Sequence, residues 1–328
     1  MKNSGIGGQA LMEGVMMRNG GTYACSVRKP NGEIAQIVEP YKNIGGSDRL
    51  RKIPFLRGPL IFLDSMKLGM KTLTWSASFF EEEEEAAEKK TEPAEGKAEE
   101  SKAQEEKKAS AGEVAVMGAS VLFALVLAVG LFVILPTVLV KLLRKVISSS
   151  FGISLLEGLI RMVIFVGYLA IISRIPDIRR VFMYHGAEHK CINCIEHGLP
   201  LTVENAKKST RFHKRCGTSF ILFSLLVSIF VGIFLPKEPL LLRIGTKLLA
   251  LPVILSLSYE FIRLAGSSNN PIIGAMSKPG LWLQRLTTRE PDESMLEVGI
   301  ASTEAVFDWE TWQRENFSDR PCPDYADR

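Results

Sequence analysis

Two long stretches of the chain contain no charged side chain. They are residues 114–140 and residues 217–236. A helix needs about 20 consecutive apolar residues to cross a lipid bilayer. Both stretches are therefore long enough to be transmembrane helices.

Two further apolar segments carry a few charges. Residues 151–173 contain Glu157 and Arg161, which are four residues apart and can form an ion pair on one helix face. Residues 241–262 carry charges only towards their ends, where they can reach the membrane surface or face other helices. We expect these segments to be two more transmembrane helices.

The four segments predict two transmembrane hairpins, at residues 114–173 and 217–262. The segment between them, residues 174–216, carries nine Lys or Arg, and residues 1–80 carry eleven Lys or Arg against five acidic residues. Such positive flanks usually stay in the cytoplasm. We therefore expect an α-helical integral membrane protein with about four transmembrane helices and a cytoplasmic α+β portion. It would lie in the cell membrane, with both termini and residues 174–216 in the cytoplasm.

Residues 1–55 form the first predicted unit, which is rich in glycine and in β-forming residues. Two runs of β-formers flank Pro30-Asn31-Gly32, a turn signal that predicts a hairpin. The glycines could hold an anion in a nest of backbone amides or could simply form tight turns. Their spacing fits no nucleotide-binding fingerprint.

Apolar residues recur every three or four positions over residues 56–80, which predicts an amphipathic helix. This helix could lie in the membrane interface or pack against the protein's own transmembrane helices. Residues 81–113 hold thirteen Glu and six Lys but no aromatic or β-branched apolar residue, so we expect a disordered acidic linker. We expect residues 263–328 to form a cytoplasmic tail that contains an amphipathic helix at residues 293–309.

The formal net charge of +4 conceals an excess of +11 outside the acidic linker. This excess suits a protein whose polar parts face the anionic cytoplasmic leaflet, and it is too small to indicate nucleic-acid binding. The expected partners are the lipid bilayer and either an unidentified protein or a substrate at the membrane surface. Composition and charge leave the oligomeric state open.

All four histidines and three of the five cysteines fall between residues 185 and 216. The cysteine count is odd, and the N-terminus lacks the apolar stretch of a cleavable signal. We therefore expect reduced cysteines in the cytoplasm, and a metal or thiol site rather than a disulfide framework.

The first candidate motif in this region is His185, Glu188 and His189. On a helix the two histidines lie one turn apart on the same face and can bind one metal ion, with Glu188 on the same side. This is the inverted form of the zincin motif, in which two histidines bind zinc and the glutamate is the general base towards water. Glu188 is thus the predicted catalytic residue, unless it is itself a ligand.

A second motif overlaps the first. Cys191, Cys194, His213 and Cys216 have the spacing of a closed structural zinc site. The two sites could coexist, or the two histidines of the first motif could share one metal with ligands of the second. Without a metal, the histidines would only form hydrogen bonds and the cysteines would be reduced thiols. A cysteine nucleophile beside a histidine is a further alternative.

Four sequence strings carry a resemblance to a known family. The strings GIGGQALMEGVMMR, MYHGAEHKCINCIEHG, RFHKRCGTSF and LTTREPD resemble the bacterial YqhQ family of membrane proteins, which are described as predicted metal-dependent enzymes. The resemblance covers most of the chain except the acidic linker and about the last twenty residues. It implies a bystander role for Cys191 and a site formed by His185, Glu188, His189, Cys194, His213 and Cys216.

The same strings contain Glu13, Arg18 and Arg289. We expect the N-terminal unit and the tail to fold over residues 174–216 and to complete the site with these side chains. The predicted function is a metal-dependent membrane hydrolase with a divalent metal, in the first place zinc, bound by His185, His189, Cys194, His213 and Cys216. Its substrate could be a peptide, a lipid head group or a phosphoester. The alternative is a non-catalytic membrane scaffold or assembly factor with a structural Cys/His metal site.

Overall fold

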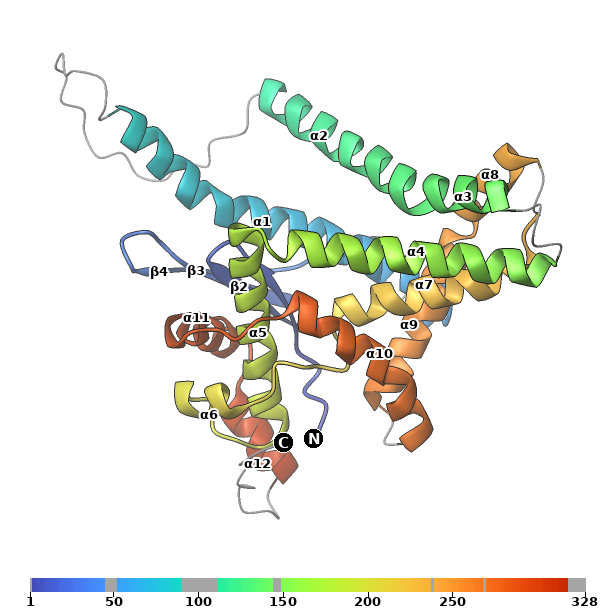
Figure 1. The fold of residues 1–328 in the computed structure, drawn as a ribbon. Coiled ribbons are helices and arrows are strands. Elements are labelled where there is room, and N and C mark those ends of the chain that lie inside the picture. The colour runs from blue at the N-terminus through green and yellow to red at the C-terminus, as the bar shows by residue number, and fades with distance from the viewer. Residues whose placement is uncertain are drawn as a thin grey trace. The chain divides into compact units, whose positions relative to one another are not determined.

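The computed structural model describes residues 2–44, 52–89, 111–143, 149–236, 239–267 and 270–317. This part of the chain is mostly helical, with a four-stranded sheet near the N-terminus (Figure 1). The chain divides into two compact units. The first comprises Met1–Glu81, Val166–Ser228 and Ala250–Arg328, and the second comprises Glu82–Phe165 and Ile229–Leu249. Most of the predicted acidic linker, residues 90–110, lies outside the described residues, as do residues 318–328 of the tail.

The sheet is an antiparallel meander in the order β1-β2-β3-β4. Its strands are β1 (Gly7–Leu11), β2 (Gly14–Asn19), β3 (Thr22–Arg28) and β4 (Ile34–Pro40). Two-residue turns join the first three strands, and the predicted turn at Asn31 joins β3 to β4. β1 and β4 are the edge strands of this N-terminal sheet.

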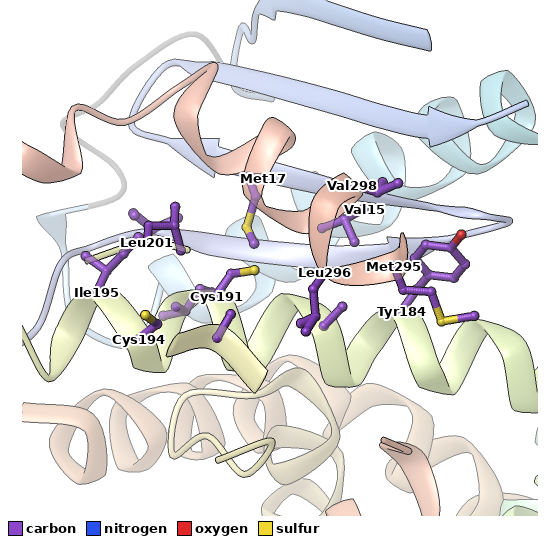
Figure 2. Close-up of a cluster of buried hydrophobic side chains, with 14 of the residues drawn as sticks. Val15, Met17, Tyr184, Cys191, Cys194, Ile195, Leu201, Met295, Leu296 and Val298 are labelled. Carbon is purple, nitrogen blue, oxygen red and sulfur yellow. The ribbon is translucent and has the colours of Figure 1, made fainter. Parts of the chain in front are cut away.

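Both faces of the sheet pack against helices, because side chains alternate between the faces of a strand. Met16 faces α1 (Arg57–Lys89). Its neighbour Met17 faces the opposite way, towards α5 (Pro176–Glu196) and α11 (Glu293–Glu304), as Figure 2 shows. The sheet is therefore the middle of three layers in the first unit.

Helix α1 contains the amphipathic helix predicted at residues 56–80. Its buried positions recur every four residues and face the sheet: Asp64, Leu68, Thr72 and Ser76. The predicted apolar stripe includes Leu63, Met66, Met70 and Leu73, which are exposed. Near its start, α1 contacts α9 (Leu251–Ser267), where Arg57 forms an ion pair with Glu260.

The other helices of the first unit lie around α5. They are the end of α4 (Ser150–Ile172), α6 (Val203–Lys208), the start of α7 (Gly217–Phe234), α10 (Pro271–Thr287) and α12 (Trp309–Phe317). Helix α7 packs against α9 through Phe223 and Phe261. It packs against α10 where Ser219 meets Gly280. These contacts fix the position of the start of α7, which follows Cys216.

The second unit contains a buried polar cluster centred on Glu157. Its helices are α2 (Ala111–Val129), the π-helix η2 (Gly130–Ile134), α3 (Leu135–Leu143), most of α4 and α8 (Leu240–Leu249). The Glu157 carboxylate lies 3.1 Å from Arg161 and also accepts hydrogen bonds from Thr137, Arg243 and Lys247. The ion pair predicted between Glu157 and Arg161 is confirmed.

Three helical stretches are long and apolar enough to cross a membrane: Gly118–Leu143, Phe151–Ile172 and Gly217–Phe234. A fourth is present if Leu240–Leu249 and Leu251–Gly266, which are bent by 43° at a short break, form one span. Pro252 follows this break, and its ring nitrogen cannot donate the backbone hydrogen bond that a continuous helix requires. These stretches coincide with the four apolar segments of the sequence.

Candidate metal centre

Helix α5 carries the HxxEH motif through the middle of the first unit. Pro176 occupies its first turn, where the missing amide costs nothing, and Gly198 follows its end with a φ of 81°. Glu188 faces β1, since a Cβ atom on Gly8 would lie 2.6 Å from its Cγ. His185 and His189 lie together on one flank of the helix, with ring centroids 4.4 Å apart.

Backbone carbonyls orient both histidines. The Nδ1 atom of His185 lies 2.8 Å from the carbonyl oxygen of Thr287, and Nδ1 of His189 lies 2.6 Å from that of Arg211. A carbonyl oxygen can only accept a hydrogen bond, so each Nδ1 carries the proton and Nε2 remains available as a ligand. Metal-binding histidines characteristically have such a partner on the other ring nitrogen.

Cys216 completes a group of three possible ligands. Its Sγ lies 3.3 Å from Nε2 of His185, and the ligand atoms of His185, His189 and Cys216 all lie within 4.8 Å of one another. The zinc–nitrogen and zinc–sulfur bond lengths predict about 3.5 Å between a nitrogen and a sulfur ligand of a tetrahedral site. One Glu188 oxygen lies 3.8 Å from Nε2 of both histidines. The donor set therefore fits a zinc ion.

The charges of this group also favour a cation. Burial alone would raise the pKa of the Cys216 thiol, but His185 and His189 outweigh burial and lower the pKa well below its usual value. Burial alone would lower the pKa of His185, but Cys216 and Glu188 raise it to about 9. Both shifts favour the charged forms of Cys216 and His185, and a divalent cation could replace the proton that lies between them.

The other two predicted ligands lie apart from this group. Cys194 is in the apolar cluster between α5, α11 and the sheet (Figure 2), with its Sγ 3.3 Å from the carbonyl oxygen of Pro200. The His213 ring lies beside that of His189, but its Nε2 is 3.5 Å from a Glu196 oxygen. Cys191 packs against Gly299 of α11. The structure therefore brings together His185, His189 and Cys216 with Glu188, and does not bring Cys194 to them.

Comparison with known proteins assigns the family. Residues 53–309 match the family described as "Protein of unknown function (DUF1385)". The chain is 36% identical over 316 residues to "Uncharacterized protein YqhQ" of Bacillus subtilis (strain 168), and this match covers 94% of each chain. The chain belongs to the YqhQ family. The resemblance expected from the four sequence strings is confirmed. No solved structure matches it.

The first and last of the four signature strings contribute backbone to the centre, whereas the two middle strings supply its side chains. The first string supplies Gly8 next to Glu188, and the last supplies the Thr287 carbonyl that orients His185. Among the charged residues of these strings, Glu13 accepts hydrogen bonds from Arg180 and Tyr184 of α5. Arg18 lies over the Tyr41 ring on the α1 side of the sheet, away from α5. Arg289 donates its backbone amide to the Phe182 carbonyl.

Gln284 supports the centre and Glu196 holds the end of α5, and neither role was predicted from the sequence. Buried Gln284 on α10 accepts a hydrogen bond from the His213 amide and donates to the His213 carbonyl and the Ser219 hydroxyl. It thereby holds both sides of Cys216. Glu196 at the end of α5 accepts hydrogen bonds from Ser4 and Arg215. Isolated polar residues without a motif carried no signal for either role.

Glu196→Gln is expected to destabilise the first unit in a pH-dependent way. Burial alone would raise the pKa of the Glu196 carboxyl, but His213, Arg215 and Ser4 lower it to about 2. Because the pKa is lower in the folded protein, the ionised carboxylate stabilises the fold at pH values above about 4.5, the pKa of the unfolded chain. This contribution to the free energy of unfolding is about 3 kcal/mol and is lost as the pH falls towards 2. Urea unfolding at several pH values should therefore show a large difference between the variant and the parent at pH 7. A difference that stays constant down to pH 2 would contradict this account.

Proposed function

We propose that this protein is a metal-dependent hydrolase of the cell membrane, with zinc bound by His185, His189 and Cys216. The observation that carries the proposal is the pair of Nδ1 hydrogen bonds to backbone carbonyls. These bonds leave the Nε2 atom of each histidine available as a ligand, and the three possible ligand atoms of His185, His189 and Cys216 lie within 4.8 Å of one another. A thiolate with two neutral imidazoles is a donor set that suits zinc.

The number of ligands favours catalysis over a structural role. Structural zinc sites have four protein ligands, whereas catalytic sites have three and keep one position open. Bound there, zinc would supply Lewis acidity, which lowers the pKa of water towards neutrality. Glu188, close to both histidines and 5% exposed, would accept the proton that water loses and deliver it to the leaving group.

The alternative scaffold function requires a closed Cys/His site, and its geometry has less support. Cys191 and Cys194 belong to the apolar cluster of α5, and burial raises the pKa of the Cys191 thiol, which favours the protonated form that does not bind metal. We therefore favour an enzyme over a scaffold with a closed Cys/His site.

We further propose that the candidate spans cross the membrane with both termini and α5 in the cytoplasm. The support is the excess of Lys and Arg in residues 1–80 and 174–216. Trypsin added to inverted membrane vesicles should cut the region around Lys207 and Lys208, which are exposed on α6. Cleavage there in right-side-out vesicles, with protection in inverted ones, would contradict this topology.

Metal analysis tests the proposed centre. The detergent-purified protein, prepared without a metal-affinity tag, is expected to contain about one zinc per chain by elemental mass spectrometry. His185→Ala, His189→Ala and Cys216→Ser should each lose most of this zinc. Cys194→Ser is the matched control and should retain it, because Cys194 lies on another flank of α5.

Two results would contradict the proposed centre. A parent protein without bound metal would remove its basis. Loss of zinc in Cys194→Ser together with retention in Cys216→Ser would support the structural site instead.

A further inference from the structure

The outer edge of β1 offers hydrogen-bonding groups next to the metal centre. The amide of Arg28 donates to the carbonyl of Glu13, so Glu13, Val15 and Met17 direct their backbone groups towards β3. Bonding alternates along an antiparallel strand. Gly14, Met16 and Arg18 therefore bond to Leu11, Gln9 and Gly7 of β1, their partners in the register. The N–H and C=O groups of Gly8 and Ala10 consequently point outwards, away from β2.

Within the described residues, these outward groups have no hydrogen-bond partner. No backbone or side-chain hydrogen bond to Gly8 or Ala10 is present there apart from the sheet itself. Both residues are partly exposed, and Gly7 is exposed. Unpaired groups along an edge strand are a template for another extended chain. Native proteins usually block such an edge with charged side chains or proline, and Gly7-Gly8-Gln9-Ala10 has neither.

This edge lies over the catalytic side of α5. Gly8 approaches Glu188 so closely that a Cβ atom would lie 2.8 Å from its Oε1. On α5, Ala187 and Cys191 lie on the flank that packs against α11, and α11 in turn contacts β2 and β3. The two zinc-binding histidines are on the opposite flank of Glu188. They therefore lie on the side of the open edge of β1.

We propose that the substrate is a polypeptide segment in extended conformation, which pairs with β1 as a fifth strand. This inference rests on the proposed function. Main-chain hydrogen bonds to Gly8 and Ala10 would bind the segment, as in other cases of strand addition to a sheet edge. A strand added at the usual spacing of about 4.8 Å lies alongside the histidine flank. Its peptide bonds would thus pass the metal centre.

The reaction on such a segment is hydrolysis of one peptide bond. One water molecule is consumed, its oxygen bonds to the carbonyl carbon, and the carbon–nitrogen bond breaks. Glu188 takes a proton from the water and passes it to the departing nitrogen, which leaves as an amine. No oxidant or other co-reactant is required.

Inhibitor binding separates the peptide inference from the metal centre. Acetohydroxamate, which binds a zinc ion and has no peptide part, is expected to bind the zinc-containing protein weakly. Acetyl-trialanine hydroxamate should bind about tenfold more tightly through two or more added hydrogen bonds. The same compound with methylated amide nitrogens should lose this gain, because it lacks the donors. Isothermal titration calorimetry measures all three on the unmodified protein.

A variant of β1 provides the matching test on the protein. In Ala10→Pro the outward amide is lost, while the bonds to β2, made by Gln9 and Leu11, remain. It should bind acetohydroxamate like the parent but lose most of the tenfold gain, whereas Ala10→Val should keep it. If the parent binds both hydroxamates equally, the peptide inference is wrong and the metal centre stands. If acetohydroxamate does not bind and no zinc is present, both proposals are wrong.

Discussion

Glu188→Gln is expected to abolish hydrolysis while zinc remains bound. Glutamine has nearly the same shape as glutamate, so it can occupy the space beneath Gly8, but its amide cannot accept a proton from water. Loss of a general base usually lowers a rate by about 10² to 10⁴. The rate on para-nitrophenyl acetate, an activated ester that serves as a probe whatever the natural substrate, measures this loss. Zinc content must be determined on the same preparation.

Glu196→Gln is the matched control for this variant. Glu196 is a second buried glutamate of α5, two turns beyond Glu188, and it contacts Arg215 rather than the histidine pair. The control should be less stable but should hydrolyse the ester at a rate close to that of the parent at neutral pH. Full activity in Glu188→Gln would favour a scaffold over an enzyme. Loss of zinc in that variant would make Glu188 a ligand.

The sequence predicted the local part of the centre because helix geometry is local. Spacings of three and four residues place His185, Glu188 and His189 on one side of any helix. To decide which cysteine joins the histidines, one must know how far this helix continues. A zinc knuckle at Cys191 and Cys194 needs a turn, yet α5 continues without a break to Glu196. In a continuous helix Cys194 lies about 140° from His189, on a flank that faces the apolar cluster.

The sequence pattern could not predict contacts between segments that are far apart in the chain. Nothing in the pattern indicated that the Thr287 and Arg211 carbonyls would orient the histidines, since any residue can supply a carbonyl. The apolar segments were predicted well because span length and hydropathy are properties of single helices. The placement of β1 over α5 depends on the packing of whole layers. The glycine-rich first string could have been an anion nest or a set of turns. In the structure β1 packs so closely on α5 that position 8 has no room for a Cβ atom, which explains Gly8.

Gly186→Ala is expected to destabilise the first unit, although alanine normally favours a helix interior by about 1 kcal/mol over glycine. A Cβ atom at Gly186 would lie 2.0 Å from the backbone carbonyl oxygen of Arg289. The segment from Thr287 to Arg289 must therefore move away from α5. The cost of such overpacking is about 3 kcal/mol. The movement also takes the Thr287 carbonyl from His185, so zinc affinity should fall about 10-fold or more.

Gly167→Ala on α4 is the matched control for this effect. Gly167 is also a helical glycine, but a Cβ atom there meets nothing within 4 Å, so this variant should be as stable as the parent or slightly more stable. Thermal unfolding and zinc titration on both variants separate the contact from the helix propensity. If Gly186→Ala keeps the stability and zinc affinity of the parent, the tail does not hold His185. The orientation of His185 would then have to come from α5 alone, which offers no carbonyl on that flank because its own carbonyls are used within the helix.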